Sequence, residues 1–282
     1  MEFILQPLTI LTFFPLLGVL ALLFIPADRK MVLRWTTLVI TLITFVISLW
    51  VLALFDASDP GLQLVARYDW ITVRDWHIQY FLGVDGLSIL LVLLTTLLTP
   101  LSILSTWTSI EERVKDFMIF FLLLEVGMTG VFLAQDLFLF YIFWEFTLIP
   151  MYFLIGVWGG PRRIYAAIKF FLYTMAGSVL MLLAILWLGT QGGKTFSLPD
   201  LIAAGGIPAN IQWWLFLAFT AAFAKKYKLE IRLVILPANS DPEETVAEPE
   251  LPFTTISTSR PSRRTTRAPE RSRSMGGVAK RA

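Results

Sequence analysis

The stretch LFLFYIFWEFTLIPMYFLIGVW, residues Leu137–Trp158, is predominantly apolar and carries one charged side chain, Glu145. At about 1.5 Å per residue such a stretch forms a helix of roughly 33 Å, which matches a bilayer hydrocarbon core of about 30 Å. Glu145 is the ninth residue of the stretch, well away from either end. A glutamate at that depth costs several kcal/mol unless it is protonated, hydrated or paired, so Glu145 is a candidate functional residue.

The composition of the whole chain agrees with a membrane protein. The 282 residues are 56% hydrophobic, with a mean hydropathy of +0.71, well above a soluble domain. The chain has no cysteine, which excludes disulfides, iron–sulfur clusters and cysteine-ligated metals, and its one histidine, His77, disfavours a histidine metal site or a bis-histidine haem. Without a glycine-rich phosphate loop or a Ser/His/Asp arrangement, we expect no cofactor in this chain.

The apolar residues fall into separate runs of about the length of a membrane span. The last run has only 14 residues before Lys225, which is short for a crossing. We therefore predict an all-α, polytopic transmembrane bundle of about six to seven spans. The runs are Leu5–Pro26, Met31–Phe55, Phe81–Trp107, Phe117–Ala134, Leu137–Trp158, Ile164–Leu188 and Ile211–Ala224.

Basic residues alternate between the connecting segments. They follow the first, fifth and seventh runs and precede the fourth, whereas the other segments carry few of them. By the positive-inside rule this pattern predicts an N-terminus outside the cell and a C-terminal tail in the cytoplasm. Residues 56–80, with several acidic and aromatic side chains, are then interpreted as an outer loop with interfacial aromatic anchors.

The surroundings of Glu145 in the sequence suit a proton-binding group. Pro150 lacks an N–H and leaves the carbonyl of Phe146 without its helical partner, next to Glu145 and Thr147. A freed carbonyl, a hydroxyl and a carboxyl can hold water inside a helix bundle. The alternative is a protonated or paired glutamate that only fixes helix packing.

The predicted spans contain further charged residues, among them Glu125 and Lys169. If the two helices are antiparallel, Glu125 is expected about 12 Å along the helix from the cytoplasmic end and Glu145 about 20 Å. The two acids are then either successive proton stations or unrelated. In the second case Glu125 would make a helix–helix hydrogen bond. Lys169 either extends to the lipid headgroups or faces the interior as a cation. Asp85 and Asp136 are most simply helix N-caps.

Three stretches together resemble one family: GVDGLS at 83–88, FLAQDLFLFYIFWEFTLIPMYFLIGVWGG at 132–160, and AAIKFFLYTMAGSVLMLLAIL at 166–186. They resemble the antiporter-like membrane subunits of bacterial NADH–quinone oxidoreductase (respiratory complex I), of the type called chain M or subunit 4. The resemblance covers about residues 1–226.

This resemblance implies a proton-translocating subunit of the bacterial inner membrane, driven by quinone reduction in other subunits. The chain itself would hold no cofactor, NADH and quinone being used by the whole complex. Its partners would be the other membrane subunits of complex I and the lipid bilayer, with no nucleic acid. The family's FWE glutamate corresponds to Glu145 and pairs with a lysine for which Lys226 is the candidate; Lys169 matches the lysine of the A-x-K-F-F segment.

After Lys226 the sequence departs from the family pattern, which continues into about seven more spans. Residues 1–226 are therefore predicted to be the N-terminal half of an antiporter-like domain, truncated after about residue 226, with Lys226 near a helix end. Residues 227–282 are predicted to be a divergent, mostly disordered basic cytoplasmic tail. The alternatives are a subunit of a multisubunit Na⁺/H⁺ antiporter and a non-transporting membrane fragment.

Overall fold

The computed structural model describes residues 6–73, 76–191, 195–205 and 207–235, with side chains given as far as Phe223. Six of its helices are long and apolar enough to cross a membrane, which confirms the predicted transmembrane helix bundle. In chain order the elements are α1 (Pro7–Phe24), α2 (Lys30–Leu54), β1 (Gln63–Val73), β2 (Trp76–Val84), α3 (Ser88–Ser105), α4 (Val114–Leu133), α5 (Leu137–Trp158), α6 (Arg163–Gln191), α7 (Leu198–Ala204) and α8 (Ala209–Ile235).

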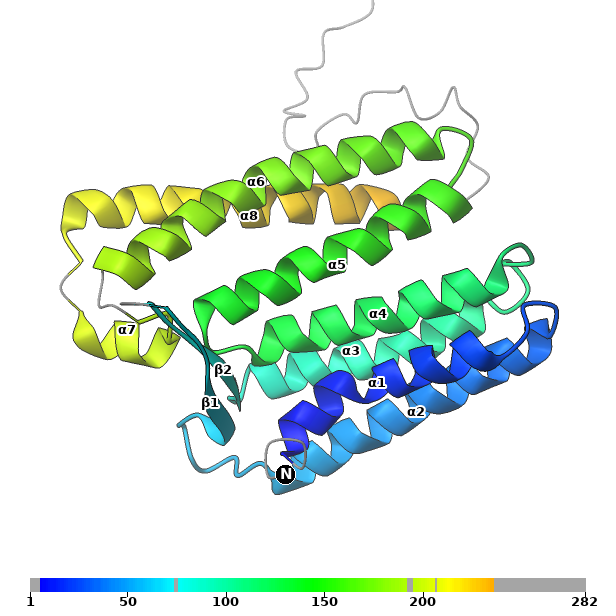
Figure 1. The fold of residues 1–282 in the computed structure, drawn as a ribbon, viewed down its shortest axis with the longest axis horizontal. Helices are drawn as coiled ribbons and strands as arrows, with labels where there is room; N and C mark the ends of the chain where they lie inside the picture. Colours follow the sequence, from blue (N-terminus) through cyan, green and yellow to red (C-terminus); the bar gives the residue numbers. More distant parts are fainter. Residues whose placement is uncertain (1–5, 74–75, 192–194, 206, 236–282) are drawn as a thin grey trace, which may run out of the picture. The chain divides into compact units, whose positions relative to one another are not determined.

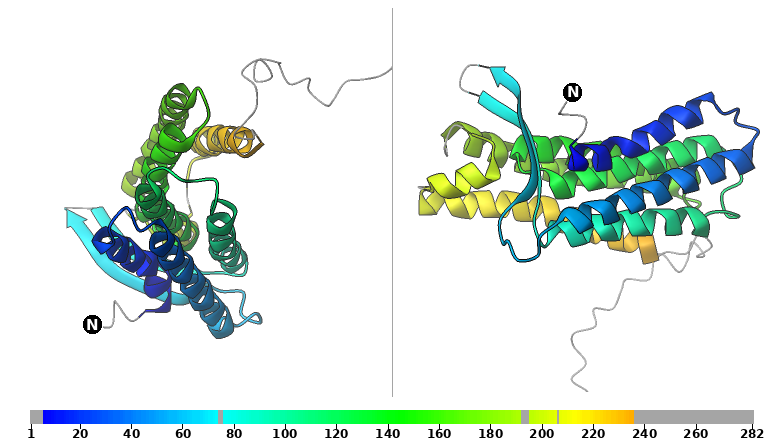
Figure 2. Two further views of the ribbon diagram at one scale, coloured as in Figure 1. Left: turned by 90° about the vertical axis from the view of Figure 1, so that its right-hand side faces the viewer. Right: turned by 90° about the horizontal axis from the view of Figure 1, so that it is seen from below.

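The long helices run roughly along one direction and pack mainly on neighbours in the chain (Figure 1). Helices α1 to α4 form one group, in which α4 contacts the other three. The other side of α4 packs on α5, α5 packs on α6, and α6 packs on α8. Figure 2 shows the hairpin β1–β2 lying across one end of the helices. Helix α5 is therefore held between the α1–α4 group and the α6–α8 pair.

The interpretation of residues 56–80 as a loop is wrong, because the structure has an antiparallel hairpin over Gln63–Val84. Tyr68 pairs with Tyr80 and Arg67 with Phe81, and the Arg67 guanidinium lies 4.9 Å from the centre of the Phe81 ring. Cross-strand aromatic pairs of this kind stabilise a hairpin. The side chains interpreted as membrane anchors thus belong to a two-stranded sheet.

The predicted third span also begins too early. Residues 81–84 belong to β2, and α3 begins only at Ser88. The Asp85 carboxylate accepts hydrogen bonds from the N–H groups of Leu87 and Ser88, at 3.1 and 2.7 Å, so it satisfies donors at the start of this helix, as expected of a cap. The change from strand to helix falls at this turn.

The last helix is longer than its apolar run. Helix α8 continues to Ile235, nine residues beyond position 226, so the backbone of Lys226 lies inside the helix and not at its end. The side chains of residues 224–235 are not described. The remainder of the predicted basic tail, residues 236–282, lies outside the described residues.

Candidate functional site: buried carboxyl groups in the membrane helices

Helix α5 is fixed at its N-terminus by Asp136, as the sequence predicted. Its Oδ1 accepts hydrogen bonds from the N–H groups of Phe138 and Leu139, at 2.9 and 3.0 Å, and its Oδ2 accepts one from Gln79 of β2, at 3.1 Å. Burial raises the pKa of Asp136, and these three N–H groups and the charge of Arg67 oppose the rise. One side chain thus joins the helix to the hairpin.

Main-chain hydrogen bonds complete this junction at the start of α5. Gln135 donates to the carbonyl of Phe81 at 2.8 Å, and Leu137 donates to the carbonyl of Phe196, also at 2.8 Å. The short segment between α4 and α5 is therefore held between β2 and the segment preceding α7. This places Glu145, which lies in the ninth position of α5, at a fixed height in the bundle.

Glu145 is partly buried near the middle of α5, and its Oε1 is buried without a hydrogen-bond partner among the described residues. Tyr141 lies one helical turn before it, and its phenol interacts with both the Glu145 carboxyl and the Ser178 hydroxyl of α6. The carboxyl therefore lies toward the α5–α6 boundary. The spacing of four residues could have indicated Tyr141 from the sequence, whereas nothing indicated Ser178.

Helix α8 reaches the same region through Phe223. Its ring lies 4.9 Å from that of Trp144 and 6.4 Å from that of Phe140, measured between centroids. Trp144 directly precedes Glu145, and position 226 follows Phe223 by about one turn of α8. The backbone of Lys226 is thus brought to the height of Glu145, although its side chain is not described.

Glu125 is the second buried acid, on α4, and it is completely inaccessible. Both of its carboxyl oxygens are buried without a hydrogen-bond partner among the described residues. A Cβ on Gly127 would lie 2.7 Å from the Thr147 side chain, which shows how closely α4 and α5 approach. From this register the two glutamates differ by about 6 Å in height, near the difference expected from the sequence.

Lys169 is not brought to either glutamate. It is exposed on α6, and its Nζ lies 5.8 Å from the centre of the Tyr165 ring. The rings of Tyr152 and Phe171 pack 5.6 Å apart and fix the register of α5 and α6. By that register Lys169 lies about 14 Å along the bundle from Glu145.

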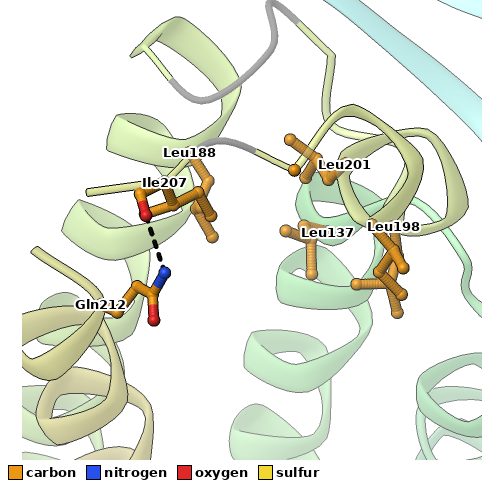
Figure 3. Close-up of a pocket in the computed structure, with 8 residues that line it drawn as sticks. Leu137, Leu188, Leu198, Leu201, Ile207 and Gln212 are labelled. Atoms are coloured by element: carbon orange, nitrogen blue, oxygen red, sulfur yellow. Dashed lines mark hydrogen bonds between the residues drawn. The ribbon is translucent and has the colours of Figure 1, made fainter. Parts of the chain in front are cut away.

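A cavity of about 300 Å³ near the start of α5 is lined by no ionisable side chain among the described residues (Figure 3). Its lining is apolar except for Gln212, whose Nε2 donates to the carbonyl of Ile207 at 2.7 Å. Nor do the described residues contain a cluster of three or more His, Cys, Asp or Glu that could hold a metal. The buried carboxyls are therefore the candidate site.

The described residues thus form a bundle of apolar helices that holds two buried carboxyl groups, those of Glu125 and Glu145. Residues 134–230 match the family described as NADH:quinone oxidoreductase/Mrp antiporter, TM, so this part of the chain is similar to that family. NADH-quinone oxidoreductase subunit M of Rhodobacter capsulatus is 48% identical over 236 residues, and the match covers 78% of this chain and 45% of that protein. Its counterpart from Rickettsia conorii is 39% identical over 223 residues, 75% of this chain and 44% of that protein.

Solved structures of membrane complexes contain chains whose fold is similar to that of this chain. A chain of respiratory complex I from Thermus thermophilus superposes with a TM-score of 0.65 at 29% identity, covering 77% of this chain and 43% of that one. A chain of the Mrp complex from Dietzia sp. DQ12-45-1b has a TM-score of 0.58 at 18% identity, covering 78% and 23%, and shows the fold alone. The chain spans about half the length of the relatives it matches.

Proposed function

We propose that this chain is a proton-translocating membrane subunit of an NADH–quinone oxidoreductase, in which Glu145 gates proton transfer. The observation that carries the proposal is the buried, unpartnered Oε1 of Glu145 in mid-helix, at the height of position 226. The similarity to relatives named subunit M supports the choice of this enzyme complex. NADH and quinone would be used by other subunits, with no redox chemistry or cofactor in this chain.

In this proposal Lys226 is the cationic partner of Glu145. A proton reaching Glu145 neutralises its carboxylate, and the Lys226 ammonium then loses its counter-ion and releases a proton more readily. When Lys226 takes up a proton again, its positive charge favours the ionised form of Glu145, which then releases its proton. Glu125 would be a further proton station, and Lys169, given its distance, would act on a group other than Glu145.

We also propose that the N-terminus and the hairpin lie outside the cell and the C-terminal tail in the cytoplasm of a bacterium. Basic side chains gather at the opposite end from the hairpin, where Lys115 donates to the carbonyls of Leu23 and Ile25 and Arg34 to that of Ile110.

Because the chain has no cysteine, single cysteines at Ser58 and Ser109 report orientation without background. An impermeant thiol reagent added to intact cells should label only the first, and labelling only the second would reverse the orientation.

Assembly and transport are tested together. The tagged chain should co-purify with the other membrane subunits of the oxidoreductase, and vesicles holding that complex should take up protons when NADH is oxidised. Co-purification with antiporter subunits and Na⁺-driven proton release would favour the Mrp-type alternative that shares this fold. Co-purification without proton uptake would indicate a non-transporting fragment.

A further inference from the structure

The α1–α4 group contains a buried polar layer between two apolar clusters. One cluster lies nearer the hairpin and includes Leu11, Val92 and Leu133, whereas the other lies nearer the opposite end and includes Leu22, Ile103 and Leu122. Between them every helix contributes polar side chains, none more than 3% exposed. These residues, here called the polar layer, are Thr12, Thr41, Thr44, Ser48, Thr96, Thr99, Glu125 and Thr129.

Close contacts between α1 and α4 place a proline at the height of the acid of this layer. A Cβ on Gly18 of α1 would lie 2.9 Å from the Leu122 side chain of α4. Lys115 donates to Leu23, so the start of α4 lies at the end of α1 and the two helices are antiparallel. Pro15 and Glu125, each three residues along its helix from the Gly18–Leu122 contact, therefore lie at the same height in the bundle.

A second proline lies at about the same height on α3. Ser48 and Thr96 hydrogen-bond at 2.8 Å and join α2 to α3 within the layer, and Pro100 follows Thr96 by about one turn. A proline has no N–H to give to the carbonyl four residues earlier. Pro15 and Pro100 thus leave the carbonyls of Leu11 and Thr96 without their helical donors.

The hydrogens of the hydroxyl groups are already in use. Thr12 donates to Leu8, Thr44 donates to Ile40 and Thr129 donates to Glu125, each to a main-chain carbonyl 2.8 to 2.9 Å away. Their oxygens keep lone pairs, so the layer offers acceptors and few donors. An ionised carboxylate is an acceptor only, whereas a protonated carboxyl and water both bring donors.

We infer that Glu125 is a proton-binding site separate from Glu145, holding its proton as a neutral acid shared with water in the polar layer. None of the side chains of the layer is basic, so no counter-ion within it stabilises the ionised form. Any role of Glu125 in proton transport rests on the proposed function, whereas the proposed binding of a proton by Glu125 does not.

The test is infrared spectroscopy of the full chain in lipid vesicles, at neutral and mildly alkaline pH where exposed carboxyls are ionised. A band of a protonated carboxyl should persist there and shift in D₂O. It should disappear in Glu125→Gln, move in Glu125→Asp, and remain in Glu145→Gln. Pro15→Ala gives Leu11 a helical donor and should move the band, whereas Pro7→Ala, at the first turn of α1, should leave it unchanged.

A Glu125→Gln spectrum identical to that of the unmodified chain would overturn the inference, as would a band that ignores D₂O. If the Glu125→Gln variant does not enter the membrane, the spectra of the unmodified chain and of Glu125→Asp still test the inference. Absence of the band at neutral pH, or a band that does not move in Glu125→Asp, then overturns it. Failure of proton uptake in the oxidoreductase would leave the band in place and count against the proposed function alone.

Discussion

The indole ring of Trp144 meets the phenyl ring of Phe223 edge to face, with their centroids 4.9 Å apart. This contact is made by the residue directly before Glu145 and by the last residue of α8 whose side chain is described. It fixes the height of α8 beside α5, and with it the height of Lys226 beside Glu145.

Phe223→Ala should weaken the packing of α8 on α5. An aromatic pair contributes about 0.5 to 1.5 kcal/mol beyond the area it buries, so thermal unfolding of the chain in detergent should occur at a lower temperature. Phe216→Ala is the control, because Phe216 lies on the same helix, is 59% exposed and stacks only on Trp213 among the described rings. Equal effects of the two substitutions would contradict the contact.

Gly130→Ala should separate α4 from α5. A Cβ there would lie 2.3 Å from the ring of Phe143, which is buried and cannot move aside cheaply. Overpacking of this kind costs about 1 to 3 kcal/mol. Gly156→Ala is the matched control, since its Cβ would meet only Ala167 at 3.4 Å. Thermal unfolding of both variants in detergent checks this, and a Gly130 variant as stable as its control would refute the close approach.

Asp136→Asn should loosen the hairpin from α5. The asparagine oxygen can still accept from Phe138 and Leu139, but its amide would then face the N–H of Gln79, donor against donor. Hydrogen exchange at Gln79 should accelerate, while exchange in the middle of α5 stays slow. Exchange at Gln79 unchanged from the original chain would show that the second hydrogen bond has no such role.

The ion pair between Arg67 of β1 and Asp200 of α7 gives a pH dependence. The hydrogen bond from Arg67 lowers the pKa of Asp200. Its contribution to stability is therefore present above the ordinary aspartate range and is lost as the pH falls through the lowered value. The protection of β1 amides against hydrogen exchange, measured relative to the intrinsic exchange rate at each pH, should fall on acidification, and Asp200→Asn should remove part of that change. The same acid response in both proteins would exclude the pair as its cause.

The sequence predicted the long helices well, and α5 has the bounds expected, Leu137–Trp158. The length of an apolar run is enough to predict such a helix, because the thickness of the bilayer sets the length of a membrane span. The hairpin was missed because its aromatic side chains also suit a membrane interface. Helix α8 outruns its apolar stretch because Lys and Leu in KKYKLE are good helix formers, so charge ends the apolar run but not the helix.

The buried site could be predicted only in part. Glu145 and Glu125 stood out because acids are rare in apolar runs, and their difference in height followed from helical rise alone. Which neighbours surround them did not follow, because helices that are apolar on all sides give no preferred face. The shared height of Pro15 and Glu125 depends on the contact between Gly18 and Leu122, which joins segments about a hundred residues apart.

The most direct test is NADH-driven proton uptake by vesicles containing the assembled oxidoreductase with Glu145→Gln in this chain. Glutamine keeps the shape of the side chain but cannot exchange a proton, so uptake should fall sharply while the subunits still co-purify and NADH is still oxidised. Glu145→Asp, which keeps the acid, should retain part of the activity. Proton uptake by the glutamine variant equal to that of the original complex would contradict the assignment of Glu145 as the gating residue.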